Sequence, residues 1–440
     1  MRPAGNRPIR TARENSNFHP NEPTNSRPSA SETLRVLWRI GPILRFVVQS
    51  PLQTPPLQVT VVLFAYETHD RGARQGRTDK AAHLQGNAIA DKTRHFRAAV
   101  STIETEESLD ELLTRPRAEL VQFIKTIRTP IVILGAGGKM GPTLAVLVRR
   151  TAEQAGREID IIAVSRFRDP EARRWLESRG VTALTCDLLD RREVSRLPAS
   201  DNVLYLVGLK FGTAQQPAQT WATNALVPAF VSEHYSAARI VAVSTGNVYP
   251  PSAVACGGSL ESDPLTPLGE YANAAVARER IFEFFSQRNG IRLALLRLFY
   301  ATELRYGVLR DIADRIWVGE PVSLANGWFN CIWQNDANEM VIRALSLASS
   351  PPRAFNLTSP QTFRVRTVAL RLGELLGKPV RFVGQESETS LTGNTSRLCA
   401  LLGTPATSLE TMLDWTASWV KSGGRSLGKP THFETRDGNY

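Results

Sequence analysis

Between residues 129 and 300, short apolar runs alternate with longer segments in which apolar residues recur every three or four positions. The short runs predict strands buried on both faces, and the longer segments predict amphipathic helices. Strands joined by helices imply right-handed crossovers, and therefore an α/β fold with a doubly wound parallel Rossmann sheet. The expected strands are 131–134, 159–164, 181–185, 203–207, 240–243 and 293–298, and the expected helices are 171–179, 221–235 and 271–287.

The pattern changes after Tyr300, where strands and helices no longer alternate strictly. We therefore expect a Rossmann domain at 129–299, a smaller mixed lobe at 300–421 that binds substrate, and a flexible polar tail at 422–440. The elements expected in the lobe are helices at 309–317, 338–348, 365–376 and 409–420, and a strand near 354–357 that returns to the sheet.

The first 128 residues differ from the rest in composition. Residues 1–98 begin with a stretch rich in Pro, Asn, Arg and Ser, which predicts a disordered basic segment. Two alternatives stay open for it, a targeting segment and a start assigned too far upstream. Its apolar stretches, such as 34–48, are too short to span a bilayer. A helical lead-in is expected at 99–128, where Ser108-Leu109-Asp110-Glu111 matches a capping box.

Charge and cysteine usage narrow the class of protein. Most of the formal net charge of +11 lies in the first 98 residues, so the body is nearly neutral and no nucleic-acid partner is expected. The cysteines form no C-x-x-C pair, so we expect neither a metal site nor disulfides, but a reducing compartment such as the cytoplasm. They are Cys186, Cys256, Cys331 and Cys399.

A glycine-rich turn, 135–141, follows the first expected strand and precedes a helical pattern. This order is typical of a dinucleotide-binding unit. Gly135 would allow the tight turn, Gly138 would let the backbone approach a pyrophosphate, and Gly141 would let helix and strand pack closely. The helix N-terminus would then present free N–H groups and a positive dipole to the phosphates. Lys139 and Met140 belong to the same turn and are expected cofactor contacts.

Ligands of such sheets bind at the carboxyl ends of the strands. Several polar or small residues follow the expected strands directly and should share this rim. They are Ser165, Arg166, Asp187, Leu188, Gly208, Lys210, Ser244 and Thr245.

Together these motifs resemble the NAD-dependent epimerase/dehydratase branch of the extended short-chain dehydrogenase/reductase superfamily, over about residues 128–420. The turn 135–141 is similar to its G-x-x-G-x-x-G, 186–188 to its acidic adenine-contact turn, and 244–250 to its S-S-x-x-V-Y-G. The stretch 261–271 is similar to the acidic run that leads into its catalytic tyrosine.

The resemblance implies roles for single residues. It makes Tyr271 the catalytic acid/base and Thr245 the catalytic Ser/Thr, and it places Asn224 near the site on a helix. Two positions depart from the family pattern. Ala275 stands where Y-x-x-x-K has lysine, and Tyr300 stands where R-x-x-N has asparagine.

The missing lysine matters because an unperturbed phenol titrates near pH ~10 and is a poor base at neutrality. A lysine at i+4 supplies a charge that lowers this pKa, and it also holds the nicotinamide ribose. Lys210, on the strand-end rim, is the candidate replacement and the third expected catalytic residue. Arg278 lies seven residues after Tyr271 on the same helix face, about 10 Å along the axis.

The cofactor implied is NADP or NAD. Ser165 and Arg166 end the second strand, where a carboxylate would favour NAD, so the sequence favours NADP. The leading hypothesis is an enzyme that transfers hydride to or from a small, sugar-like carbonyl or hydroxyl substrate. The alternative is a catalytically impaired NAD(P)-binding sensor or scaffold. We expect no membrane span, and a homodimer is an open alternative to a monomer.

Overall fold

The computed structural model describes residues 39–40, 44–45, 103–210, 212–213 and 215–438. The chain divides into two compact units, Met1–Lys80 and Ala81–Tyr440. In the first unit, β1 (Arg39–Ile40) pairs antiparallel with β2 (Leu44–Arg45). The expectation of a disordered segment at 1–98 falls almost wholly outside the described residues.

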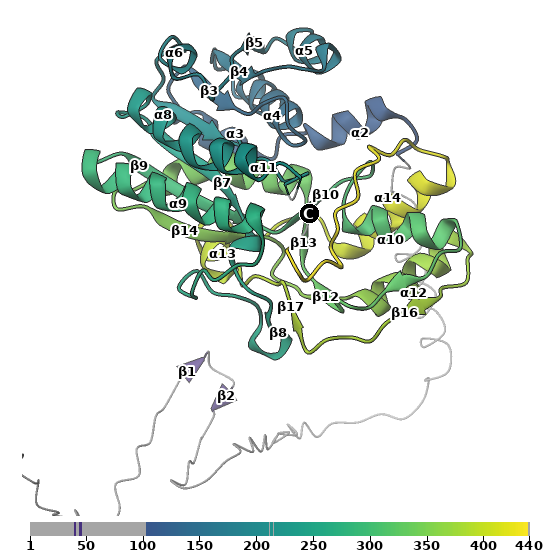
Figure 1. Ribbon diagram of the computed structural model, residues 1–440. Coiled ribbons are helices and arrows are strands. Elements are labelled where there is room, and N and C mark those ends of the chain that lie inside the picture. Colours follow the sequence, from purple (N-terminus) through teal and green to yellow (C-terminus); the bar gives the residue numbers. More distant parts are fainter. Residues whose placement is uncertain (1–38, 41–43, 46–102, 211, 214, 439–440) are drawn as a thin grey trace, which may run out of the picture. The chain divides into compact units, whose positions relative to one another are not determined.

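A parallel sheet organises the second unit (Figure 1). Its strand order is β14-β9-β7-β6-β3-β4-β5, and every neighbouring pair is parallel. The predicted doubly wound Rossmann sheet is therefore confirmed. The strands are β3 (Ile131–Leu134), β4 (Ile161–Ser165), β5 (Thr182–Thr185), β6 (Asn202–Tyr205), β7 (Arg239–Thr245), β9 (Arg292–Leu298) and β14 (Arg353–Leu357).

The strand order reverses between β3 and β6, which makes this pair the switch point of the sheet. Alternate side chains of β3 enter different cores, because successive residues of a strand point to opposite faces. Ile131 and Ile133 pack on the face covered by α3 (Ala118–Ile124), α4 (Gly141–Gln154) and α11 (Gln334–Arg343). Val132 and Leu134 pack on the opposite face.

Other helices cover the opposite face of the sheet, the one that carries Val132 and Leu134, or connect its strands. The second face is covered by α8 (Val227–His234) and α9 (Glu270–Asn289). A π-helix, η1 (Ala222–Leu226), links α7 (Pro217–Trp221) to α8, so the single expected helix over 221–235 consists of three segments. The remaining short helices are α5 (Pro170–Glu177) and α6 (Arg191–Val194).

The lead-in helix starts one turn before the expected capping box. Its N-cap is Thr105, which accepts a hydrogen bond from the Ser108 backbone N–H, while the Ser108 hydroxyl returns to the Thr105 backbone N–H. Ser108 is thus the third helical residue of α2 (Glu106–Leu113), and the expectation of Ser108 as the cap was wrong. Both hydroxyls can take the capping role, and the reciprocal pair satisfies two N–H groups at once.

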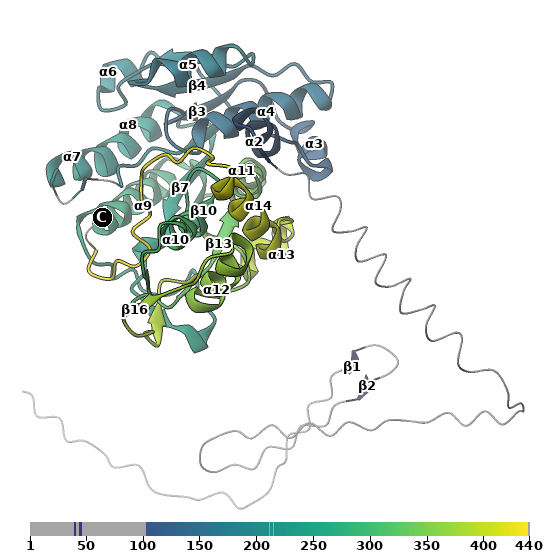
Figure 2. The ribbon, with the colours of Figure 1, turned by 90° about the vertical axis from the view of Figure 1, so that its right-hand side faces the viewer.

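The smaller lobe has its own apolar core. Its helices α10 (Val308–Trp317), α12 (Val365–Leu376) and α14 (Leu409–Lys421) pack on one another. Short strand pairs complete the smaller lobe (Figure 2), whereas α13 (Ser396–Leu402) packs on β14 in the core of the main sheet. The pairs are β10 (Tyr300–Thr302) with β13 (Cys331–Trp333), β11 (Val322–Ser323) with β16 (Phe382–Val383), β12 (Trp328–Phe329) with β15 (Phe363–Arg364), and β8 (Ser252–Ala253) with β17 (Thr389–Ser390).

The chain after α14 packs on the body, in contrast to the flexible tail expected from its composition. Thr431 and Phe433 are buried, and Asn326 donates a hydrogen bond to the Phe433 carbonyl at 2.7 Å. Figures 1 and 2 show this yellow stretch passing α10 toward α9. An apolar anchor within a polar segment is enough to hold it. Within the described residues, no helix is long and apolar enough to cross a membrane, and no cluster of metal-ligating side chains forms.

Candidate functional site

The glycine turn lies at the switch point and leaves its backbone open. Gly135 has φ +82, and a Cβ there would lie 3.0 Å from the backbone of Leu206 and Val207 on the neighbouring strand end. A Cβ at Gly141 would collide with the Ala136 backbone, so only glycine lets α4 start this close to β3. At Gly138 a Cβ would meet one atom, the Gly135 carbonyl oxygen at 3.2 Å, and would point into the space above the turn.

The N-terminus of α4 has no side-chain cap among the described residues. Its first-turn N–H groups therefore face outward with the positive end of the helix dipole. Backbone N–H groups, an uncapped helix and glycines without side chains fit a diphosphate. This turn could hold the phosphates of a dinucleotide, as the sequence predicted.

The residues expected around the adenosine half follow β4 and β5, and Ser165 lies beside the glycine turn. Ser165 ends β4, and its hydroxyl would be 2.7 Å from a Cβ at Gly137. Arg166 follows it and is exposed. Asp187 follows β5, and its carboxylate accepts a hydrogen bond from the Leu189 N–H at 3.1 Å, which fixes the turn. The described residues at the end of β4 include no carboxylate that would repel a 2′-phosphate.

Thr245 and Tyr271 lie on the other side of the switch point. Thr245 ends β7 and caps the short helix η2 (Gly246–Val248), with its hydroxyl 3.0 Å from Asn247 Oδ1. η2 packs on α9, and Tyr271 is in the first turn of α9, with 7 % of its surface exposed. The fold thus brings the two expected catalytic residues to adjoining elements.

Ser244, expected to contact the cofactor, points inward instead. Its hydroxyl donates to buried Glu279 Oε1 at 2.5 Å. Glu279 also pairs with Arg297, whose guanidinium donates to Tyr249 Oη at 2.6 Å. Burial raises the pKa of Tyr249 to about 12, although the charge of Arg297 acts in the opposite direction. This network fixes β7 and β9 to α9 and keeps the Ser244 side chain away from the rim.

Two half-buried lysines approach the site from different elements. Lys139 Nζ donates to the Ala301 carbonyl at 2.8 Å and lies 3.7 Å from the ring centroid of Tyr306. Lys210 Nζ donates to the Thr431 carbonyl at 3.5 Å. Tyr306 in turn interacts electrostatically with Tyr271. Lys139 therefore extends from the glycine turn toward the tyrosine side, a reach that the sequence did not reveal.

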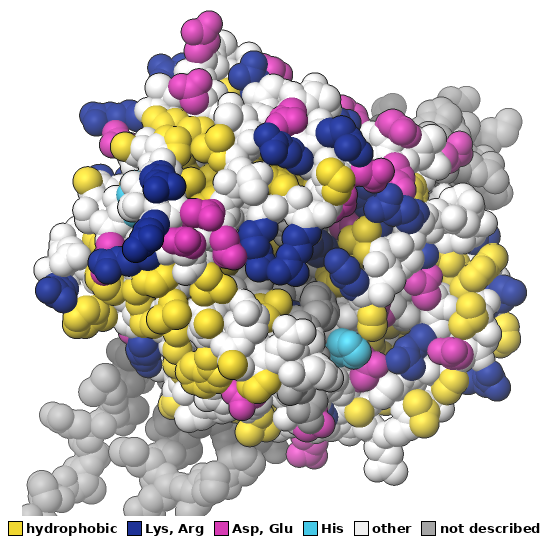
Figure 3. Space-filling model, turned by 45° about the horizontal axis from the view of Figure 1, so that its top comes forward, with side chains coloured by type: hydrophobic (Ala, Val, Ile, Leu, Met, Phe, Trp, Pro, Cys, Tyr) yellow, Lys and Arg dark blue, Asp and Glu magenta, His cyan; other side chains and the backbone are white. Residues whose placement is uncertain are grey.

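Burial lowers the pKa of both ammonium groups. The pKa of Lys139 falls to about 7, mainly by desolvation and further by the charge of Lys210, while Glu303 opposes the shift. The pKa of Lys210 falls to about 8 by desolvation, with Asp311 opposing it. Figure 3 shows Lys and Arg side chains gathered near the middle of one face, with acidic side chains beside them. An anionic ligand would stabilise both ammonium groups.

The stretch after α14, residues 422–438, lies beside Lys210 through Thr431. Asp311, on α10, accepts hydrogen bonds from the Thr431 N–H at 2.8 Å and from its hydroxyl. Arg436 donates to the Thr389 carbonyl at 2.7 Å. Gly438 lies so close to Gly269 that a Cβ at Gly269 would collide with it. The stretch thus connects the smaller lobe to the residue that precedes α9.

Comparison with known proteins identifies the family. The model of the NAD dependent epimerase/dehydratase family matches residues 131–357. The chain belongs to this family. No curated protein sequence matches it.

Solved structures with this fold include three epimerases. UDP-glucuronic acid 4-epimerase from Bacillus cereus, in complex with NAD, is 16 % identical with a TM-score of 0.57. UDP-glucose 4-epimerase from Thermotoga maritima, with UDP-glucose, is 18 % identical at 0.55. UDP-glucose 4-epimerase from Thermus thermophilus, with NAD, is 17 % identical at 0.53. Each comparison covers 67 % of this chain and 99 % of the other.

The chain is therefore classed with the NAD-dependent epimerase/dehydratase enzymes, and its two departures from the family pattern lie on α9 and β10. Ala275 is buried in a cluster with Val248, Tyr249 and Leu391, so its own side chain brings no cation to the position of the family lysine. Tyr300 begins β10, outside the buried Arg297 network. Among the expected rim residues, Leu188 is buried, Met140 is half-buried and Gly208 is exposed.

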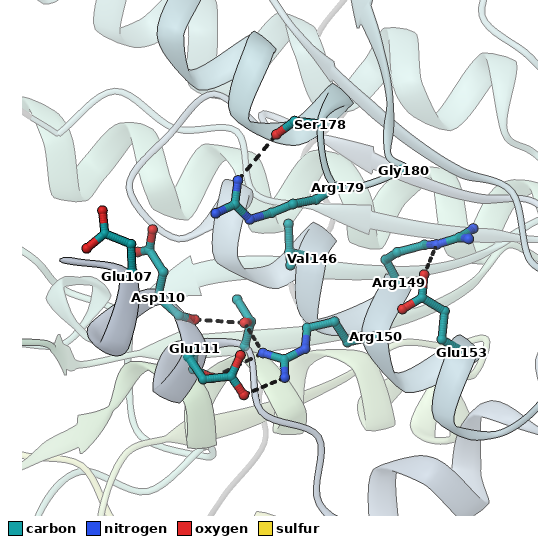
Figure 4. A pocket seen from close by; sticks show the side chains of 11 residues that line it. Glu107, Asp110, Glu111, Val146, Arg149, Arg150, Glu153, Ser178, Arg179 and Gly180 are labelled. Carbon is teal, nitrogen blue, oxygen red and sulfur yellow. Dashed lines mark hydrogen bonds and ion pairs between the residues drawn. The ribbon is translucent and has the colours of Figure 1, made fainter. Parts of the chain in front are cut away.

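A surface cavity of about 500 Å³ lies elsewhere, between α2, the C-terminal half of α4 and the turn before β5 (Figure 4). Its arginines are engaged within the cavity wall, since Arg150 pairs with Glu111 and Arg149 with Glu153. The turn before β5 lies at the amino end of that strand, whereas the glycine turn lies at the carboxyl end of β3. This cavity is not part of the candidate active site.

Proposed function

We propose that the protein binds NADP or NAD across the β3–β6 switch point and transfers hydride to or from a sugar-like substrate. The observation that carries the proposal is the open glycine turn at the switch point, with Thr245 and Tyr271 on the adjoining side. The bound nicotinamide would supply the hydride acceptor or donor.

The chain's own residues would hold and move the proton. Tyr271 would exchange a proton with the substrate hydroxyl or carbonyl oxygen, and the Thr245 hydroxyl would hydrogen-bond the same oxygen. Lys210, which follows β6, would supply positive charge in place of the family lysine whose position Ala275 occupies. The neighbouring structures that contain UDP-glucose or belong to UDP-sugar epimerases support nucleotide sugars as the first substrate class to test.

We also propose a preference for NADP. Ser165 and exposed Arg166 at the end of β4 offer a hydroxyl and a guanidinium to a 2′-phosphate, which a charge-assisted bond would bind. The smaller lobe would bind the substrate, and the cytoplasm is the compartment that we propose from the cysteine pattern. A homodimer is proposed only as the first assembly to test.

Calorimetric titration with NAD⁺ and NADP⁺ tests the binding step, followed by turnover with a panel of nucleotide sugars and simple aldehydes. We expect Lys210→Ala to reduce hydride transfer by about 10²-fold while cofactor affinity is largely kept. Lys125→Ala is the matched control, because Lys125 is exposed and caps the C-terminus of α3. Full activity of Lys210→Ala would reject its role. Tight cofactor binding without turnover on any substrate would favour the sensor hypothesis, which Ala275 supports.

A further inference from the structure

The helix that carries Tyr271 has a buried cation one turn beyond Ala275. Arg278 is the next positively charged residue of α9 after Ala275, and 3 % of its surface is exposed. Side chains of a helix lean toward its N-terminus, so the guanidinium of Arg278 can reach back toward the strand ends. Arg278 is therefore a buried cation on the helix of Tyr271, three residues after the position where the family has lysine.

The guanidinium lies directly at the switch point. Its Nη1 donates to the Val207 carbonyl at 2.9 Å, and a Cβ at Gly208 would be only 2.8 Å from Nη1. Val207 also flanks the glycine turn, since its backbone nitrogen would lie 3.0 Å from a Cβ at Gly135. The absence of a side chain at exposed Gly208 therefore leaves Arg278 in reach of a ligand that crosses the turn.

Two polar groups at this point have no partner among the described residues. Arg278 forms no ion pair there, and its buried Nε makes no hydrogen bond. Asn224 is fully buried on the π-helix. Its Nδ2 donates to the Thr220 carbonyl, and its Oδ1 accepts nothing and lies 3.7 Å from the Cβ position at Gly208. Buried polar groups are almost always hydrogen-bonded, and an unpaired buried charge is strongly unfavourable. Both side chains lie against Gly208, and each keeps one buried polar atom without a partner among the described residues, which points to a ligand at this place.

We propose that Arg278 and Asn224 bind the hydroxyl groups of the second ribose of the dinucleotide, the one attached to nicotinamide. The inference rests on the proposed NAD(P) binding. With the diphosphate at the glycine turn and the adenosine half over β4 and β5, the second nucleoside lies over the ends of β6 and β7. A vicinal diol both donates and accepts, so it complements a guanidinium N–H and an amide oxygen.

Fragments of the cofactor separate this role from a structural one. ADP-ribose contains the second ribose without nicotinamide, whereas AMP contains only the adenosine half. We would titrate the full chain and its Arg278→Met variant with NAD⁺, ADP-ribose and AMP by calorimetry. Arg278→Met keeps the apolar stem and removes the buried charge, a change that need not destabilise the protein. Arg278→Lys retains the charge and carries the test if Arg278→Met does not fold.

We expect Arg278→Met to weaken NAD⁺ and ADP-ribose binding by about tenfold to a hundredfold and to leave AMP binding within about twofold. Arg280→Met, which removes an exposed pair with Glu283 on the same helix, should change none of the three. Equal losses for all three ligands, or unchanged ADP-ribose affinity, would overturn the inference. If the unmodified chain bound neither NAD⁺ nor AMP, the proposed function itself would fail, and that outcome is distinct.

Discussion

The two sides of the switch-point crevice are built differently. On the glycine-turn side the proposed ligand-facing groups are mostly backbone N–H groups. Close backbone approach requires glycine at 135 and 141, and Gly138 leaves open space above the turn. On the side of Tyr271 the proposed ligand-facing groups are side chains: Tyr271 on α9, Asn224 on the π-helix and Lys210 after β6. Family motifs are kept on the first side, and both departures, Ala275 and Tyr300, are on the second. A backbone site depends on a few glycines, whereas a side-chain site can exchange one cation for another from a different element.

The largest effect on turnover should come from removing the phenol hydroxyl of Tyr271. We expect Tyr271→Phe to lower turnover by about 10²–10⁴-fold, because a positioned proton donor or acceptor is lost. Cofactor affinity should be unchanged, since the glycine turn is untouched. Steady-state rates and calorimetry on the same preparation measure both quantities. An active Tyr271→Phe variant would remove the tyrosine from the mechanism.

The next effect concerns the buried hydrogen-bond network of Glu279 and Arg297, which connects α9 to the sheet. Glu279→Gln leaves the Arg297 guanidinium buried without its carboxylate, so we expect a loss of about 3–5 kcal/mol in the free energy of unfolding. Glu283→Gln on the same helix removes a more exposed pair and should change it by about 0–1 kcal/mol. Urea unfolding followed by circular dichroism measures both variants. Similar values for the two would show that the buried network does not stabilise this region.

The glycine-turn side is tested by Gly138→Val. The new side chain would occupy the space above the turn, so we expect NAD(P) affinity to fall at least about tenfold, in line with a lost set of charge-assisted bonds. The melting temperature should change little, because one atom, the Gly135 carbonyl oxygen, lies near the added Cβ. Unchanged affinity in a folded variant would contradict diphosphate binding at this turn.

The pH dependence of cofactor affinity shows how much Lys139 and Lys210 contribute beside the backbone N–H groups of the glycine turn. The pKa values of Lys139 and Lys210 lie at about 7 and about 8, so both ammonium groups are lost as the pH rises toward 9. An anionic cofactor favours the charged forms, and its affinity should therefore fall several-fold between pH 7 and 9. Calorimetry in two buffers should also detect proton uptake on binding near pH 8. A flat profile would indicate that the glycine turn alone binds the phosphates.

The smallest effect is expected from removing the N-terminal 98 residues. Every apolar core of the described chain is built from residues between Ile103 and Phe433. A chain that begins near Val100 should therefore melt within about 2 °C of the full chain, measured by differential scanning calorimetry. A larger loss would show that the segment packs on the body.

The sequence predicted the fold well because its apolar periodicity is a local signal. The strand 131–134, the glycine turn and the helix 365–376 depend on neighbouring residues, and the structure has them where they were expected. The orientation of Ser244 depends on Glu279, 35 residues away, and the reach of Lys139 depends on Ala301, 162 residues away. Such contacts are set by tertiary packing, which no local pattern encodes.

Asn224 illustrates a partial success. The family resemblance placed it near the site, but nothing in the residues around it predicted a π-helix or an unpaired Oδ1. Arg278 was visible as a residue on the same helix face as Tyr271. Only the contact of its guanidinium with Val207 shows that it returns to the strand ends.

The contact between Gly438 and Gly269 has a consequence for how the protein is made. A ribosome emits residue 438 long after residue 269, so the segment that leads into the tyrosine helix gains this neighbour late in synthesis. Until then the Rossmann strands can form and pair, while this side of the site is incomplete.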